Sequence, residues 1–504
     1  MNTSAEPTGS DDDLARRVGS LSPTARAELR DALLRRRASA PGIPRRTGSG
    51  PAPLSFSQQR MWFLDQWEPM SPTNNGARAI RLQGDLDTDA LARGITAVVE
   101  RHEILRTTYT VQEREPVQVP LDDWSLEMPV VDLTQVAADS REEELARLLR
   151  EAARGGFDLG ADLMLRPTLF RMSPTEQVLL LSIHHIAFDA ASDRVFNGEL
   201  AELYGASVEG RTPQLPELPI QFADYAVWQR ERLQGSLLEK LLSYWREALA
   251  DAPERLRLPA DRARAQVQAH RGKHRYVSFD GALGADIAAL ARSEGVTAFI
   301  VLLAAFDALL YRFTGQEDIL VGSPVAGRNE SELEGLIGFF TNTLVLRNRL
   351  AGNPTFRDLL ARVRASTAGA LAHQELPFEK LVESLQVRRD PSFNPIFQVN
   401  FRANAQERQL LQLPGVRTLG AIDVDIGFSR FDLALELQIE GGELGGYFEY
   451  DEDLFDAATI DLLAADFEQL VRKVVVAPET PILALGPRRS GAGRNRSPIP
   501  RTSH

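Results

Sequence analysis

The chain has 504 residues, no cysteine and a formal net charge of −13 at pH 7. The length exceeds what one hydrophobic core supports and predicts two or three domains. The lack of cysteine excludes disulfides, thiolate nucleophiles and cysteine-ligated metal sites, and the acidic balance argues against a nucleic-acid partner. No apolar run reaches the roughly 18 residues of a membrane span and no signal-peptide pattern opens the chain, so we expect no membrane contact and a cytoplasmic location.

The first 50 residues differ in composition from the rest of the chain. Residues 1–13 are small, polar and acidic and are predicted to be disordered. Leucines at helical spacing predict helix within 14–38, and a linker rich in proline, glycine and arginine follows. We therefore interpret 1–50 as a partly disordered leader that precedes the folded body.

The body opens with a mixture of helical and strand-like patterns. In chain order these are helix 54–64, strand 77–83, helix 87–102, helix 141–155, strands 164–172 and 177–184, and a helix from after Asp189 to about Tyr204. A proline-rich stretch at 207–220 then marks a change of region.

The second half repeats this mixture. Its predicted elements are a helical stretch at 222–248, strand 274–280, helices 284–294 and 297–313, strand 318–324, helices 355–372 and 377–385, strands 396–402 and 430–450, and helix 456–476. Because neither half alternates strands and helices regularly, the fold class is α/β of the mixed α+β kind. We assign the two units to 51–230 and 231–486, with a disordered basic tail at 487–504.

An apolar, β-prone run ends in two adjacent histidines, His184 and His185, with Asp189 four residues further on. Neighbouring side chains of a strand point to opposite faces, so one histidine is expected to face a cleft and the other to be buried. A neutral imidazole with an ordering carboxylate nearby is typical of general base chemistry. A buried histidine pair at a strand end is the alternative, and a metal site is not expected because no third ligand has a suitable spacing.

Seven stretches, in order, resemble the condensation domains of nonribosomal peptide synthetases, and the similarity covers about 51–486. They are Ser55–Leu64, Arg101–Tyr109, His184–Asp189, Phe222–Trp228, Ile337–Thr343, His373–Glu379 and Arg389–Pro395. The resemblance implies two chloramphenicol-acetyltransferase-like domains that form a V around a central tunnel. Carrier proteins would present substrates on their phosphopantetheine arms at the tunnel mouths, and no bound cofactor is expected.

The resemblance also implies roles for individual residues. His185 would deprotonate or orient the acceptor and stabilise the tetrahedral intermediate, while His184 would be structural. Asp189 would pair with an arginine that shapes the loop, Arg328 being the first candidate and Arg106 the second. Polar residues that match the family near the tunnel are Asn394, Asn342 and Ser192; for the two asparagines, turn and strand-end capping is an equally good interpretation.

The chain departs from the family directly after its histidine motif. Where relatives have Asp-Gly-Trp-Ser, this chain has Asp189, Ala190, Ala191 and Ser192. An alanine tolerates a helical φ but not a left-handed one, and it adds a methyl group close to the reacting centre. We expect retained activity with an altered pocket.

The resulting functional hypothesis is a free-standing condensation enzyme, because no adenylation signature or carrier-protein attachment serine flanks the domain. It would join a carrier-bound acyl group, of the L-donor type, to an amine or alcohol acceptor, giving an amide or ester. An epimerisation-type domain and a non-catalytic recruiting domain, a class that loses the second histidine, are the alternatives. Candidate carrier-docking side chains are Arg45, Arg46, Arg362 and Arg364, for each of which a solvated surface is the competing interpretation.

Overall fold

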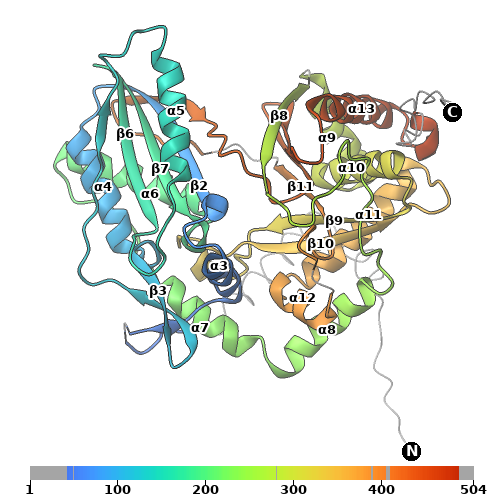
Figure 1. The fold of residues 1–504 in the computed structure, drawn as a ribbon, viewed down its shortest axis with the longest axis horizontal. Coiled ribbons are helices and arrows are strands. Elements are labelled where there is room, and N and C mark those ends of the chain that lie inside the picture. The colour runs from blue at the N-terminus through green and yellow to red at the C-terminus, as the bar shows by residue number, and fades with distance from the viewer. Residues whose placement is uncertain (1–41, 49, 280, 388–389, 405–408, 487–504) are drawn as a thin grey trace, which may run out of the picture.

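Figure 1 shows two lobes side by side, with the blue-to-green part of the chain in one and the yellow-to-red part in the other. The computed structural model describes residues 42–48, 50–279, 281–387, 390–404 and 409–486. The leader helix predicted within 14–38 and the tail predicted at 487–504 lie outside the described residues. The mixed α/β class and the V-shaped pair of lobes are as predicted.

The first lobe is a five-stranded sheet with helices on both faces. Its strand order is β12 (Val416–Ile422), β2 (Asn75–Gly84), β7 (Glu176–His184), β6 (Leu165–Ser173) and β5 (Val130–Asp132). Helices α4 (Thr88–Arg101) and α6 (Ser192–Glu209) pack on one face, and α5 (Arg141–Arg154) packs on the other.

Strand β7 is buried on both faces, and its central run, Val178–Leu181, is entirely apolar. Leu179, Leu181 and Ile183 pack into the α4 and α6 layer, whereas Val178 and Leu180 pack against α5. This period-two alternation continues to His184, the last residue of the strand, which points to the α5 side. The position of His185 is therefore set by the turn that follows the strand.

The second lobe is a six-stranded mixed sheet covered by helices. Its strand order is β10 (Asn342–Arg349), β9 (Asp318–Val325), β11 (Val399–Asn404), β13 (Leu433–Glu440), β14 (Glu443–Asp451) and β8 (Gly272–Phe279). The covering helices are α9 (Ala282–Glu294), α10 (Ala298–Thr314), α11 (Phe356–Ala372) and α13 (Ala457–Val476).

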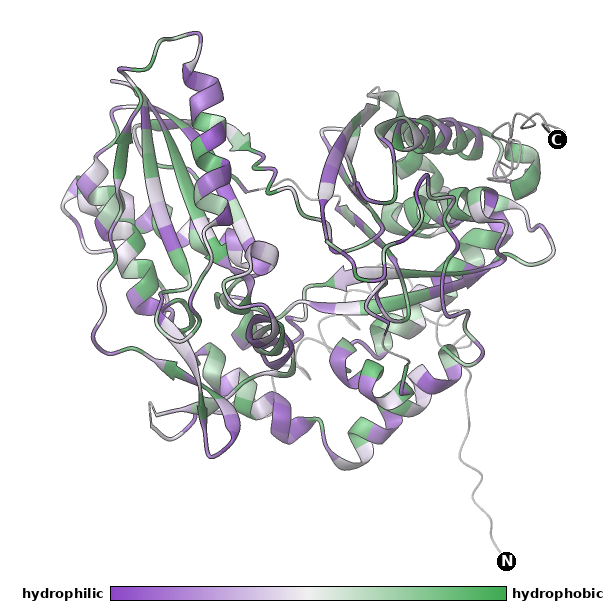
Figure 2. Cartoon of the chain, in the orientation of Figure 1, coloured by the Kyte–Doolittle hydropathy of each residue, from purple (hydrophilic) through white to green (hydrophobic). Residues whose placement is uncertain are grey.

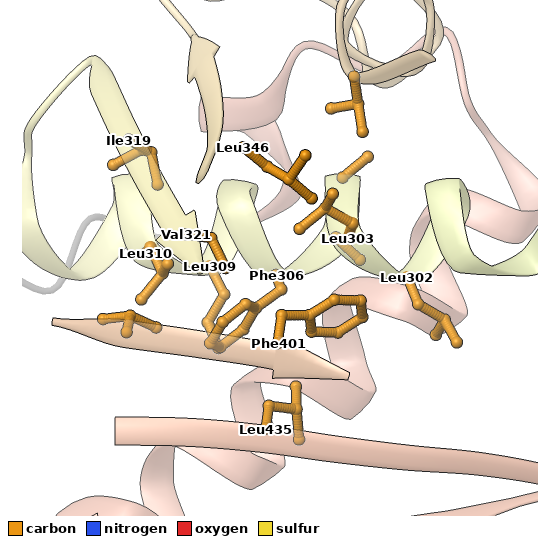
Figure 3. Packing of buried hydrophobic residues seen from close by; sticks show 14 of the residues in the cluster. Leu302, Leu303, Phe306, Leu309, Leu310, Ile319, Val321, Leu346, Phe401 and Leu435 are labelled. Atoms are coloured by element: carbon orange, nitrogen blue, oxygen red, sulfur yellow. The ribbon is translucent and has the colours of Figure 1, made fainter. Parts of the chain in front are cut away.

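Helix α10 forms the centre of the second lobe. It is hydrophobic nearly all round (Figure 2), as a buried core helix must be. Phe306 stacks on Phe401 of β11 with ring centroids 5.5 Å apart, among leucines from α10 and residues of three other strands (Figure 3). Within the described ranges no single helix is long and apolar enough to span a membrane; α9 and α10 pass that test only as a pair, bent by 103°.

Shorter elements join the lobes. They are α3 (Phe56–Trp67), α7 (Phe222–Arg232), α8 (Gly235–Ala248), α12 (Phe378–Leu385) and a small sheet of β1 (Ala52–Pro53), β4 (Glu115–Pro120) and β3 (Thr107–Gln112). The helix predicted at 222–248 is thus two helices, because the chain leaves the helical path at Leu233 and Gln234.

Further elements of the structure differ from the sequence prediction or were not predicted. The strand predicted at 430–450 is the hairpin β13–β14, which turns at Gly441 and Gly442, both with positive φ. Strand β10 was not predicted. Strand β12 was not predicted either, and it leaves the second half of the sequence to pair with β2 in the first lobe. It is the second chain crossing between the lobes.

Candidate active site at the two-histidine turn

His184 ends β7 as a buried residue with 2% of its surface exposed. Its Nδ1 accepts a hydrogen bond from the Ile186 backbone at 3.2 Å, and its ring packs beside Phe157 with centroids 5.8 Å apart. Burial, assisted by the charge of Arg430, lowers the pKa of His184 to about 3. A neutral ring that bonds its own turn is a structural element of the site.

His185 begins the short 3₁₀ turn His185–Ala187 and is half-buried. Its Nδ1 lies 3.2 Å from the carbonyl oxygen of Phe188, and because a carbonyl can only accept, Nδ1 carries the proton. Nε2 then keeps its lone pair. Burial and the charge of Arg430 lower the pKa of His185 well below its ordinary value, so the imidazole is neutral at pH 7 and Nε2 is available as a proton acceptor.

Gly76 of β2 lies beside the His185 ring. A Cβ built at Gly76 would sit 3.7 Å from both Cε1 and Nε2 of His185, which is ordinary contact distance. The neighbouring residue, Asn75, is paired with His184 in the β2–β7 register. Its side-chain amide donates to the carbonyls of Ala153 and Gly155 at the end of α5. The start of β2 is thereby fixed, and at Gly76 this strand places no side chain against Nε2 of His185, which has no hydrogen-bond partner among the described residues.

Asp189 is buried, with 2% of its surface exposed, and both of its oxygens accept hydrogen bonds. Oδ1 accepts from Nη2 of Arg328 at 3.0 Å and from the Ser192 backbone at 2.9 Å. Oδ2 accepts from the Phe340 backbone at 3.0 Å. The carboxylate therefore joins the histidine motif to the segment that connects the end of β9 to the start of β10.

Arg328 is the partner of Asp189, as the resemblance implied, and it holds more than that carboxylate. Its Nη1 donates to the carbonyls of Leu333 and Leu336, and its guanidinium lies 4.2 Å from the ring centroid of Phe340. Arg106, the second candidate, instead donates to the carbonyl of Leu121 at 2.5 Å. Arg106 thus fastens the β3–β4 hairpin and does not bind Asp189.

Ser192 belongs to the same network, which corrects the prediction of a substrate-facing serine. The residue is fully buried, and its hydroxyl lies 2.8 Å from Oδ1 of Asp189 and 3.0 Å from the Gly338 carbonyl. It also accepts from Arg328 at 2.9 Å. Gly338 itself tolerates no side chain, because a Cβ there would lie 2.2 Å from the ring of Phe222.

Ala190 is exposed in the turn between Asp189 and α6. It is not among the residues with positive φ within the described part of the chain, so its backbone suits an alanine without strain. Ala191 follows in a right-handed helical conformation as the residue before α6. The departure from the family sequence is therefore conformationally neutral.

The two asparagines bind backbone groups. Asn342 donates to the carbonyls of Gln374 and Leu376, both at 2.8 Å, and accepts from the Phe378 backbone. Asn394 donates to the carbonyl of Arg430 at 2.6 Å. For Asn342 the capping interpretation fits the structure. Asn394 holds a residue whose charge acts on both histidines of the motif.

Sequence reasoning gave no role to two residues that the structure places near the motif. His102 is fully buried; its Nε2 lies 2.9 Å from Glu199 and its Nδ1 accepts from the Ile337 backbone. His102 stands in one of the seven family-like stretches, so that signal was present. Arg430 stands in none of them.

Three of the four arginines predicted to dock a carrier bind this chain itself, whereas Arg364 is exposed and has no hydrogen bond or ion pair within the described residues. Arg45 donates to the carbonyls of Leu218 and Pro219, and Arg46 pairs with Glu103 and Asp224 with only 13% of its side chain exposed. Arg362 donates to the Arg349 carbonyl. Arg46 thus attaches the leader to the first lobe, and the prediction that it is a free docking residue is wrong.

A pocket opens near the Arg328 side of the motif, lined by α7, the loop after β9 and the segment before α12; its lining includes Tyr225, Trp228, Phe340, Asn342 and Glu375. His184 and His185 do not line it. No group of three histidine, aspartate or glutamate side chains in the described ranges is arranged to hold a metal ion.

Comparisons with known proteins agree on one family. The family model of the condensation domain matches residues 49–486. A linear gramicidin synthase from Brevibacillus parabrevis is 45% identical over 434 residues, which are 86% of this chain but 8% of the synthase. The chain thus spans a small part of this curated relative.

Solved structures give the same result. The X-domain from teicoplanin biosynthesis is 31% identical with a TM-score of 0.79, over 88% of this chain and 99% of that one, and it has also been solved in complex with OxyB. SgcC5 from Streptomyces globisporus, solved with (R)-(-)-1-(2-naphthyl)-1,2-ethanediol and sucrose, is 27% identical with a TM-score of 0.70, over 85% of this chain and 100% of that one.

Proposed function

Since the chain belongs to the condensation-domain family, we propose that it transfers an acyl or aminoacyl group from a carrier-protein thioester to an amine or alcohol acceptor. The product is an amide or an ester. The observation that carries this proposal is the neutral imidazole of His185, whose Nδ1 proton is committed to Phe188 and whose Nε2, beside Gly76, has no hydrogen-bond partner among the described residues.

The reaction requires one proton to move as one bond forms and another breaks. The acceptor nitrogen or oxygen attacks the thioester carbonyl, and Nε2 of His185 takes the proton that this atom loses. The tetrahedral intermediate then collapses with cleavage of the carbon–sulfur bond. The proton passes to the leaving thiolate of the carrier's phosphopantetheine arm, which leaves as a thiol, and His185 returns to its neutral form.

The Asp189–Arg328 pair has a different role in this proposal. Neither group faces solvent, since their side chains are 1% and 7% exposed. Both oxygens of Asp189 and both terminal nitrogens of Arg328 bind protein groups. They hold the turn that follows His185, and a substrate does not reach them. His185 is the catalytic residue, and Asp189 acts through the shape of the loop.

A non-catalytic recruiting domain is the second candidate function. The likeness to the teicoplanin X-domain, which binds OxyB, favours it. Against it stands the second histidine of the motif, which recruiting domains lose and this chain retains as His185. Acyl transfer is therefore the better-supported function. The ethanediol bound by SgcC5 supports keeping alcohols beside amines among the acceptors to be tested.

The test uses a carrier protein loaded with an aminoacyl thioester, a panel of amine and alcohol acceptors, and product detection by mass spectrometry. We expect His185→Ala to lower the rate roughly 10²- to 10⁴-fold, the usual contribution of a general base. The matched control is His373→Ala, because His373 also directs Nδ1 to a backbone carbonyl, that of Gly369 at 2.8 Å, and it should leave the rate unchanged.

Two results would contradict the proposal. Equal rates for the native protein and His185→Ala would remove His185 from the chemistry. Absence of product with every acceptor, while the carrier still binds, would favour the recruiting function.

A further inference from the structure

The side chains of Asn394 and Glu449 hold the backbone of Arg430 in place. Arg430 lies between the crossover strand β12 and the start of β13, in the second lobe. Its carbonyl accepts the side-chain amide of Asn394 at 2.6 Å, and its N–H donates to Oε1 of Glu449 at 3.4 Å. Both backbone groups of this one residue are thus bound by side chains, which fixes the direction in which its own side chain leaves the lobe.

The Arg430 side chain reaches the other lobe. Its Nη2 donates to the carbonyl of Thr73 at 3.2 Å. Thr73 lies three residues before Gly76, and the intervening Asn75 is paired with His184 in the sheet register. The guanidinium therefore ends at the short segment whose glycine lies against Cε1 and Nε2 of His185.

The Arg430 guanidinium has no direct ion pair within the described part of the chain. No carboxylate among the described residues forms an ion pair with the Arg430 guanidinium, whose hydrogen-bond acceptor is the Thr73 carbonyl. Glu449 bonds the Arg430 backbone and pairs with His274. Burial lowers the pKa of Arg430 and the charge of Glu449 raises it, so the positive charge is partly compensated without a direct ion pair.

The other charged and titratable groups that face His185 differ in this respect. Arg78 of β2 lowers the pKa of His185 less than Arg430 does. Arg78 is also paired, because both oxygens of Asp193 from α6 lie 2.9 Å from the Arg78 Nε. His184 of β7 is neutral through burial. Asp189, on the turn itself, is bound to Arg328. After burial, Arg430 is the largest influence that keeps the His185 ring from gaining a proton.

We propose that Arg430 is a positioning residue for acyl transfer: Asn394 directs its guanidinium from the second lobe to the Thr73 carbonyl, at the segment that flanks Nε2 of His185. This inference rests on the proposed function of His185. It also gives Asn394 a role, since that side chain fixes the arginine. Because charge and imidazole belong to different lobes, the basic form of His185 is favoured only while the lobes hold the spacing that the Thr73 contact sets.

The first test measures His185 directly and needs no turnover. The chain has seven histidines, so the ring resonances of histidine-labelled protein can be titrated by NMR, with His185 assigned through His185→Gln. We expect Arg430→Gln to move the His185 titration upward by roughly one pH unit or more, the usual effect of removing a close charge. Arg430→Lys should leave the titration near its native position because it keeps the charge.

Arg154→Gln is the matched control. Arg154 of α5 also joins the lobes through one guanidinium-to-carbonyl bond, to Ile426 at 2.9 Å, and it is not among the groups that act on His185. The variant should leave the titration unchanged. If Arg430→Gln behaves like this control, the proposal is wrong. If Arg430→Gln does not fold, Asn394→Ala, which frees the arginine backbone, should shift the titration in the same direction by less.

The second test follows the pH dependence of kcat/KM. Protonated His185 accepts no proton, so activity is lost on the acid side, and Arg430→Gln should move this acid limb to higher pH. An unmoved limb together with a shifted NMR titration would overturn the catalytic part of the inference. Absence of turnover in the native protein would instead count against the proposed function, while the NMR comparison would still decide whether Arg430 acts on His185.

Discussion

The two ends of the histidine motif are only four residues apart, yet their surroundings are opposite. Asp189 accepts hydrogen bonds from Arg328, from the backbones of Ser192 and Phe340, and lies close to the Ser192 hydroxyl. His185 makes a single bond with its ring, to Phe188, and its Nε2 has no hydrogen-bond partner among the described residues. The second lobe reaches both ends: Arg328 pairs with Asp189 at one, and Arg430 binds the Thr73 carbonyl near the other.

This contrast separates a structural role, at Asp189, from a catalytic role, at His185. At Asp189 both carboxylate oxygens and both terminal nitrogens of Arg328 are bound within the protein, and the Arg328 Nε, which has no hydrogen-bond partner, is buried. At His185 one donor is committed, one acceptor is left open, and a positive charge nearby favours the neutral ring. A change at the Asp189 end should therefore damage folding, and a change at the His185 end should damage chemistry in a protein that remains folded.

The largest effect is expected from Asp189→Ala. It leaves the buried Arg328 guanidinium without its counter-charge, and breaking a buried pair in this way costs about 3–5 kcal/mol. Thermal unfolding should show a greatly lowered Tm or a failure to accumulate soluble protein. Asp193→Ala is the control, because its partner Arg78 is 39% exposed and such pairs contribute little. Equal Tm values for the two variants would show that the buried Asp189–Arg328 pair does not stabilise the fold more than an exposed pair does.

Gly76→Ala tests the other end. The added methyl would lie 3.7 Å from Nε2 of His185, so it fits sterically but occupies the space through which the acceptor approaches. We expect kcat to fall roughly 10-fold or more, since displacements of about 1 Å at a reacting pair have effects up to 10², with no loss of Tm. The control, Gly198→Ala in α6, meets no atom within 4 Å and should keep full activity. Native kcat in Gly76→Ala would show that this edge is not the approach path.

Much of the fold was predictable because periodicity is local. The α10 pattern and the apolar β7 run each predict their elements within two residues. Strand β12 was not predictable in this way, since it exists through pairing with β2, which lies more than 300 residues earlier in the chain. Its alternation is weak and includes Gly420, where the register shifts. Length and the mixed pattern of elements predicted two units, whereas their V-shaped arrangement came from family resemblance.

The site was predictable to the extent that the family motifs contain it. The Asp189–Arg328 pair followed from the resemblance, and the structure has it. Ser192 was misassigned, although its spacing of three residues from Asp189 at a helix start is the spacing of a capping interaction. Arg430 was missed because its importance depends on where the second lobe brings it, to Thr73, which no local pattern encodes.

A smaller effect is expected from a third contact between the lobes, at His274 of β8. This ring stacks on Tyr447 and pairs with Asp423, just after β12, and with Glu449. Burial lowers its pKa, but the two carboxylates outweigh burial and raise it to about 10. Because the folded-state pKa lies above the unfolded value near 6.5, this stabilisation is complete below pH 6.5 and is lost as the pH rises to about 10.

The measurement for His274 is Tm as a function of pH. The native protein should lose a few degrees more than His274→Gln between pH 7 and pH 10, whereas Asp189 variants should differ from native equally at both values. Parallel curves for the native protein and His274→Gln would mean that this contact does not stabilise the folded state.

The smallest effect is expected from Ala190→Gly, although Ala190 follows the motif directly and departs from the family sequence. Ala190 is exposed and its backbone lies outside the left-handed region, so the methyl group causes no strain and its removal frees none. We expect kcat and KM within roughly two-fold of native and a Tm lowered slightly, because glycine gives the unfolded chain more conformational entropy. A large gain in kcat would place the Ala190 backbone in contact with the reacting atoms. The catalytic part of the motif would then extend past Asp189 to Ala190.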